Sequence, residues 1–389
     1  MGRNKLYAAL CAALLSGPVL GAGLQLYTEG SAEALGQAGA ISGRDDLTSL
    51  AWYNPSALAG ADRPALMVGS VFASIKTDYA DGATDASMSE DWRVIPHLYY
   101  VQPLTDDVTA TLSINAPYGL ITEWSADWAG APLAIYSDLE AVYLTPSVAW
   151  RPIDSFAASF GVNVVSATAE LTRSAFPAPG EVKVKGDDMT YGYTFSARYQ
   201  PFENWAVGGR YQSRVDLKIT GALETGGVRL PASAELDLPS SFNIGVANTS
   251  IRNLSLGLDL VWTEWSVYDS LDIVAPPAPT TSSAKNWDDV ISVRLGGEYA
   301  LGESWALRAG YVWDQSPVPD ATRSPELPGS DRQMLMFGFG WTCCGNVTLD
   351  AAYSYLWADS TAIGANPLGL TGEFETTTHL VGLSIGYDF

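Results

Sequence analysis

The sequence has few of the residues that metal and redox enzymes depend on. Its 389 residues include three cysteines and two histidines, and two of the cysteines, Cys343 and Cys344, are adjacent. A structural zinc site needs about four spaced Cys or His ligands, so we expect no metal and no cofactor. The adjacent pair fits a vicinal disulfide and two thiols equally well. His97 and His379 do not stand in a Gly-x-Ser-x-Gly setting, so we interpret both as structural or lumen-lining and expect no enzyme.

Positive charge is also scarce. Lys and Arg number 21 against 43 Asp and Glu, which gives a formal net charge of −22. Such acidity argues against binding to nucleic acid or to an anionic membrane surface by charge. It would suit bridging by divalent cations at a lipopolysaccharide surface, although acidic loops are also simply well solvated.

The basic residues that open the chain belong to a processing signal. Arg3 and Lys5 precede the apolar run 6–15, and the small residues 21–23 follow. This order of basic, apolar and small residues predicts a secretory signal peptide over residues 1–22. Its removal takes away two cations and no acids, so the net charge falls from −22 to −24.

Beyond the signal, no apolar run reaches the roughly 18 residues that a membrane-spanning helix needs. Yet 47% of the residues are hydrophobic. A transmembrane β-barrel reconciles the two observations, because only alternate residues of each strand must be apolar and a closed barrel satisfies its own backbone groups.

Alternation of apolar and polar or small residues is visible along the chain. Leucines at every second position lead to Trp262 in the segment 254–262, and the segments 108–115, 305–314 and 381–389 follow the same rule. Several such segments run to about ten residues, the length that a tilted membrane strand needs. Tryptophans near the segment ends fit the aromatic girdles at the two membrane interfaces. The terminal Phe389 resembles the signal that outer-membrane barrels present to their assembly machinery.

Connection lengths predict the number of strands. Short turns are expected at 104–107, 152–154, 202–204, 251–253, 302–304 and 344–346. Long connections are expected at 78–91, 122–138, 173–186, 219–233, 268–288, 315–330 and 358–372. Six short turns and seven long loops predict an all-β fold, a 14-stranded antiparallel transmembrane barrel over residues 64–389.

The segment 23–63 precedes the first expected strand. It holds many small residues, but also Leu24, Leu35, Leu50 and Trp52, which are too many apolar side chains for a disordered leader. A barrel of this size has a lumen that is wider than its own side chains can fill. We therefore expect residues 23–63 to fold into the lumen as an N-terminal plug, or hatch.

Five segments resemble the FadL family of outer-membrane transporters for long-chain fatty acids and aromatic hydrocarbons. They lie at 22–26, 51–58, 262–266, 305–320 and 327–332, in the family's order and across essentially the whole mature chain. The resemblance implies a channel for passive uptake of a hydrophobic small molecule in the outer membrane of a Gram-negative bacterium. We expect a monomer surrounded by outer-membrane lipid and lipopolysaccharide.

Within the resemblance, Asn54, Pro55 and Ser56 match the family's Asn-Pro-Ala hatch motif, with Ser56 in place of alanine. Serine and alanine are both small, so the tight packing is expected to survive the replacement. The motif implies that the hatch gates the passage of solute. Asn bonds readily to nearby backbone and Pro presets its own dihedral, so a compact turn is expected here.

The family also implies lateral release of solute through a gap at a kinked third strand. Here the third strand contains Asn115, Pro117, Tyr118 and Gly119. Proline cannot donate to a ladder and glycine weakens a strand, so this is a physically sensible place for a break. The alternative is that Pro117 merely ends the strand at its loop.

Other residues extend the hypothesis. Trp124 and Trp128 are candidates for an outer capture surface, or equally for the interface belt. Arg198, Arg210 and Arg308 are lumen cations that could meet a carboxylate, although the sequence does not rank them. Two other functions stay open, a general diffusion porin and, with less support, a barrel hydrolase.

Overall fold

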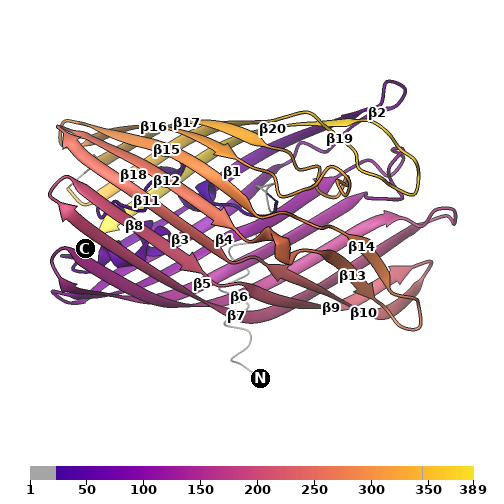
Figure 1. The fold of residues 1–389 in the computed structure, drawn as a ribbon, viewed down its shortest axis with the longest axis horizontal. Helices are drawn as coiled ribbons and strands as arrows, with labels where there is room; N and C mark the ends of the chain where they lie inside the picture. The colour runs from indigo at the N-terminus through magenta and orange to yellow at the C-terminus, as the bar shows by residue number, and fades with distance from the viewer. Residues whose placement is uncertain (1–22, 344) are drawn as a thin grey trace.

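The computed structural model describes residues 23–343 and 345–389, so the expected signal peptide 1–22 and Cys344 lie outside the described residues. The chain forms a closed barrel of 14 antiparallel strands (Figure 1). In chain order its strands are β1 (Ala65–Ala80), β3 (Trp92–Thr105), β4 (Val108–Glu123), β5 (Tyr136–Ile153), β6 (Phe156–Ser174), β7 (Glu181–Phe202), β8 (Trp205–Gln212) continued by β9 (Val215–Thr225), β10 (Val228–Leu238) continued by β11 (Ser241–Ile251), β12 (Leu254–Thr263), β15 (Val290–Leu301), β16 (Trp305–Asp314), β17 (Arg332–Cys343), β18 (Val347–Ala358) and β20 (Glu373–Asp388). The first and last strands pair from Ala65↔Asp388 to Ala80↔Glu373, which closes the barrel.

The six expected short turns all join consecutive strands, as at Thr105–Val108 and Phe202–Trp205. Two expected long loops differ from the structure. Of 173–186, only residues 175–180 lie between β6 and β7, and 219–233 is not a long loop. The chain there is a two-residue turn at Gly226 and Gly227, whose φ angles are 54° and 80°. Two adjacent residues with positive φ match the twist of a tight hairpin, so the polar stretch on either side stays in β9 and β10.

Several short elements lie at the end of the barrel that bears the longer loops. They are β2 (Asp85–Ser87), β19 (Thr361–Ala362) and the hairpin of β13 (Ser270–Val274) and β14 (Thr281–Ala284), which follows η3 (Trp265–Val267). The hairpin pairs with β10 at Ser233↔Val274 and Ala234↔Ile273. This pairing fixes the hairpin over one side of the barrel mouth.

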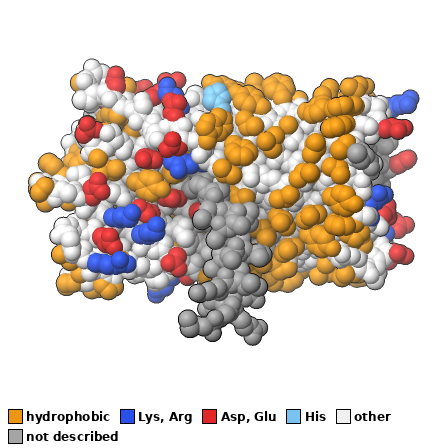
Figure 2. Space-filling model, turned by 180° about the vertical axis from the view of Figure 1, so that it is seen from behind, with side chains coloured by type: hydrophobic (Ala, Val, Ile, Leu, Met, Phe, Trp, Pro, Cys, Tyr) orange, Lys and Arg blue, Asp and Glu red, His pale blue; other side chains and the backbone are white. Residues whose placement is uncertain are grey.

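On the face that Figure 2 shows, apolar side chains form a broad band over the barrel, and most charged side chains lie toward its two ends. Leu383 and Ile385 are 50% and 46% exposed, whereas the intervening Ser384 is buried. His379 shares the outward face with them and bonds to Tyr353, so of its two expected roles, structural or lumen-lining, the second is wrong. Among the described residues, no helix is long and apolar enough to span a membrane.

Residues 23–58, which precede β1, lie inside the barrel (Figure 1). They form η1 (Thr28–Gly30), α2 (Ala32–Leu35), α3 (Leu50–Tyr53) and η2 (Pro55–Leu58). Helix α2 contacts β1, β17, β18 and β20, while α3 contacts β3 and β4 and η2 contacts β5, β6 and β7. Contacts with strands on all these sides, and burial of nearly every residue, place this plug in the lumen.

Glycines in the wall allow the plug to approach it closely. A Cβ on Gly208 would collide with the carbonyl oxygen of Ser42, and one on Gly257 would collide with that of Ala40. Any larger residue at these two positions would force the plug backbone away from the strands.

Candidate functional site

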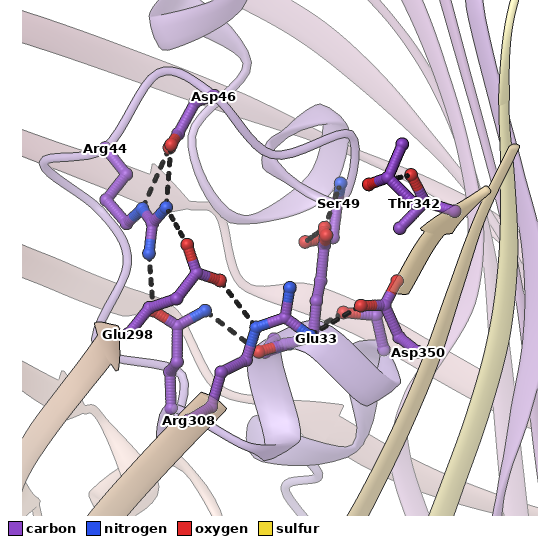
Figure 3. Close-up of polar contacts among 12 residues, drawn as sticks. Glu33, Arg44, Asp46, Ser49, Glu298, Arg308, Thr342 and Asp350 are labelled. Carbon is purple, nitrogen blue, oxygen red and sulfur yellow. Dashed lines mark hydrogen bonds and ion pairs between the residues drawn. The ribbon is translucent and has the colours of Figure 1, made fainter. Parts of the chain in front are cut away.

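On one side, the plug is attached to the wall by a buried ionic network (Figure 3). Arg308 on β16 donates from Nε to Glu298 Oε2 at 2.6 Å and also pairs with Asp350 on β18. Arg44 of the plug donates to Glu298 Oε1 at 2.8 Å and pairs with Asp46 at 2.7 Å. Glu298 therefore links a plug arginine to a wall arginine, and the guanidinium groups of both are buried.

Glu33 of α2 extends this network toward α3. Its Oε1 accepts hydrogen bonds from the Ser49 amide at 3.0 Å and from the Ser49 hydroxyl (Figure 3). Burial raises the pKa of Glu33 to about 7, with Asp350 adding to the rise and Arg308 opposing it. The network holds both the internal fold of the plug and its position against β15, β16 and β18.

The Asn54-Pro55-Ser56 motif lies in the part of the plug that contacts β5, β6 and β7. Asn54 donates from Nδ2 to Ser42 O at 2.7 Å, and its Oδ1 accepts from the Ser56 hydroxyl at 2.6 Å. The Ser56 amide donates to Ser196 Oγ on β7 at 2.9 Å. Ser56 thus does more than stay small, since alanine could not donate to Asn54.

The third strand is irregular where the sequence indicates. Its register with β5 shifts between Asn115 and Tyr118, and its pairing with β3 ends at Leu98↔Ile114. The strand nevertheless continues to Glu123, so Pro117 does not end it. The alternative interpretation of Pro117 is therefore wrong.

Beyond the last pair with β3, the start of the plug forms backbone hydrogen bonds with β4 instead. The Leu26 amide donates to Pro117 O at 2.8 Å, and the Gly119 amide donates to Leu24 O at 2.8 Å. Tyr118 projects across the lumen, where its hydroxyl donates to Pro239 O at 3.0 Å. We call residues 24–26 the edge segment, because they serve as a short antiparallel partner for the shifted stretch of β4.

A cavity of about 90 Å³ lies next to the edge segment and is lined mainly by apolar side chains. Its walls include Leu24, Leu120, Leu236, Trp287, Val318 and Leu327. A larger space of about 450 Å³ lies beside it among the outer loops. The two share lining residues, among them Leu171, Leu271 and Ile273, so they are neighbouring spaces.

Trp124 and Trp128 are buried rather than displayed. Their rings stack at 4.6 Å between centroids, and Tyr79 and Phe374 complete the cluster. Trp124 donates to Pro325 O at 3.0 Å and Trp128 to Ala134 O at 2.8 Å. The expectation of an exposed aromatic capture surface is therefore wrong, because these indoles form a small core that supports the loop after β4.

The three lumen arginines help to hold the plug in place. Arg198 pairs with Asp45 at 2.7 Å, Arg210 donates to Trp52 O and lies over the Trp52 ring, and Arg308 belongs to the ionic network. None of the three lines the cavity. Among the described residues, no group of three or more His, Cys, Asp or Glu is placed to hold a metal ion.

Sequence reasoning missed the charged pair that does line the cavity. Lys285 Nζ lies 2.6 Å from Glu326 Oε2, although the two residues are far apart along the chain. The available signal was weak. Lys285 is an isolated lysine close to Ala284 and Trp287. Such apolar neighbours are more typical of a lysine whose aliphatic side chain is buried than of one in a solvated loop.

Comparison with known proteins agrees with this architecture. The chain is 25% identical to the long-chain fatty acid transport protein of Escherichia coli K12 over 443 residues, which cover 98% of this chain and 97% of that protein. A solved FadL homologue from Pseudomonas aeruginosa has a TM-score of 0.84 at 23% identity, covering 96% of this chain and 100% of that one. The toluene transporter TodX of Pseudomonas putida gives 0.75 at 15%, covering 94% and 99%.

The family model for outer membrane protein transport proteins (OMPP1/FadL/TodX) matches residues 12–389. This range includes the plug, every strand and the cavity. The chain therefore belongs to the OMPP1/FadL/TodX family of outer membrane transport proteins, and its location is the outer membrane of a Gram-negative bacterium.

Proposed function

We propose that this protein is a passive channel for hydrophobic solutes such as long-chain fatty acids or hydrocarbons. One observation carries the proposal. Leu24 lines the apolar cavity, and its carbonyl also accepts the hydrogen bond from Gly119 of the third strand. A solute in the cavity would therefore press on the same segment that covers the irregular stretch of the barrel wall.

The proposed route begins in the larger space among the outer loops and continues into the apolar cavity. Burial of apolar surface favours transfer of the solute from water into this cavity. Displacement of the edge segment would then break its bonds to Pro117 and Gly119. The solute would leave sideways between β3 and β4, where the ladder is incomplete.

Lateral release has a physical advantage at this position. Backbone groups that face hydrocarbon without partners cost several kcal/mol each, so a gap in the wall needs a substitute partner while closed. The edge segment supplies that partner. It can withdraw into the lumen without breaking any pair of full-length strands.

The hatch motif would keep the main part of the plug in place. Asn54 and Ser56 join the plug to itself and to Ser196, while the ionic network holds the opposite side. Gating is therefore proposed as movement of the edge segment relative to a plug that stays in place.

The test replaces Pro117 with Val and Gly119 with Thr, which favours a continuous strand. The double variant should fold, reach the surface and bind solute, but its uptake of a labelled fatty acid or alkane should fall to that of cells lacking the protein. Normal uptake at normal surface levels would place the exit elsewhere. Large, steady ion conductance and passage of sugars into liposomes by the unaltered protein would instead favour a porin.

A further inference from the structure

The apolar cavity contains one closely paired cation and anion. Lys285 lies between β14 and β15, and Glu326 lies in the loop between β16 and β17. Lys285 Nζ and Glu326 Oε2 are 2.6 Å apart, and the lysine side chain is only 6% exposed. The positive charge is thus matched before any solute arrives.

Both residues are held in place by their backbones. The Lys285 amide donates to Asp269 O at 2.7 Å, and its carbonyl accepts from the Thr322 hydroxyl at 2.6 Å. The Glu326 carbonyl accepts from Thr122 at 3.1 Å. The pair therefore belongs to the architecture of the cavity and is not a chance meeting of two mobile side chains.

Among the described residues, the other cation that lines the cavity is already paired. Lys185 contributes to the lining, but its amine lies 2.8 Å from Glu170 and its side chain is 66% exposed. Asp138, which also lines the cavity, adds a carboxylate that accepts from the Tyr136 hydroxyl at 2.9 Å. A carboxylate solute would therefore meet a neutralised lysine and further negative charge.

We propose that Glu326 is a specificity-determining residue that reserves this cavity for uncharged hydrophobic molecules, such as hydrocarbons and long-chain alcohols, over carboxylates. The proposal rests on the proposed function and narrows its substrate class. Its physical basis is that an ionised carboxylate in apolar surroundings needs a partner of opposite charge. Among the described residues, Lys285 is the only buried cation that lines the cavity, and Glu326 is already paired with it.

The test compares decanol with decanoate at neutral pH, two ligands that differ in the head group alone. Tryptophan fluorescence of the purified protein in detergent reports binding, since Trp287 lines the cavity. The unaltered protein should bind decanol at least about tenfold more tightly than decanoate, because the carboxylate is desolvated without a free cation. Glu326→Gln frees Lys285 and should reverse this preference while changing decanol affinity little.

Two controls separate specificity from folding. Lys285→Met combined with Glu326→Gln removes both charges, so it should bind decanol and still reject decanoate. Glu224→Gln removes the carboxylate of an exposed pair with Arg229 on the β9–β10 hairpin, and it should change neither affinity. Heat-modifiable mobility on a gel checks that each variant forms a barrel.

Each outcome has one meaning. A reversed preference in Glu326→Gln that disappears in the double variant supports the proposal. Equal binding of both ligands by the unaltered protein, or an unchanged preference in Glu326→Gln, overturns the role of Glu326 and leaves hydrophobic uptake standing. Failure of the unaltered protein to bind either ligand overturns the proposed function as well.

Discussion

The plug meets the barrel wall in two contrasting ways. Toward β15, β16 and β18 the contact is ionic, with buried arginines and carboxylates from both sides. At the shifted stretch of β4 the plug is held by two backbone hydrogen bonds, from Leu26 to Pro117 and from Gly119 to Leu24, surrounded by apolar side chains.

The difference concerns what happens when each contact breaks. Separating a buried ion pair leaves charges without partners, which costs several kcal/mol per ion. Breaking a neutral hydrogen bond costs about 0.5–1.5 kcal/mol net where new partners can form. The plug is therefore anchored on one side and releasable on the other, which suits a channel whose proposed exit lies at β4.

Arg308→Met tests the anchored side and should have the largest effect. It leaves Asp350 buried without its cation, so the free energy of unfolding should fall by about 3–5 kcal/mol. Denaturant titration followed by heat-modifiable gel mobility measures the change. Arg308→Met with Asp350→Leu removes both charges and should recover much of the loss. A stability change within about 0.5 kcal/mol, typical of unremarkable surface sites, would show that the network is no anchor.

Asn54→Ala tests the hatch motif that lies between the two sides. Ser42 O and the Ser56 hydroxyl lose their partner, which should destabilise the plug by about 1–3 kcal/mol while the barrel stays folded. Solute uptake, normalised to surface level, should fall. Ser56→Ala, which restores the family's alanine and keeps the bond between Asn54 and Ser42, should have a smaller effect. Unchanged uptake in Asn54→Ala would count against hatch gating.

Leu26→Pro tests the releasable side and should have the smallest effect on stability. It removes the amide that donates to Pro117 O, at a cost of about 0.5–1.5 kcal/mol. Hydrogen exchange at the Gly119 amide should become faster, since its bond to Leu24 O loses a neighbour. Gln25→Ala leaves both backbone bonds intact and serves as the control. Equal exchange in the two variants would mean that the edge segment does not open as a unit.

Much of the architecture follows from local features of the sequence. A period of two residues, turns such as Phe202–Trp205 and an apolar leader before residue 64 led to a barrel with a plug, because alternation and turn length are short-range properties. The stretches 181–186 and 219–225 were expected in loops but are paired in structure, since strands that extend beyond the membrane need no apolar face.

The site depended on the tertiary structure. Trp124 and Trp128 looked like a surface pair and are buried, because Tyr79 and Phe374 from distant strands cover them. Sequence also assigned no cation to the cavity, since pairing of Lys285 with Glu326 is decided by two loops that meet only when the barrel closes. Alternation fixes which face a side chain takes, whereas its partner and its access to solvent depend on neighbours that arrive from elsewhere in the chain.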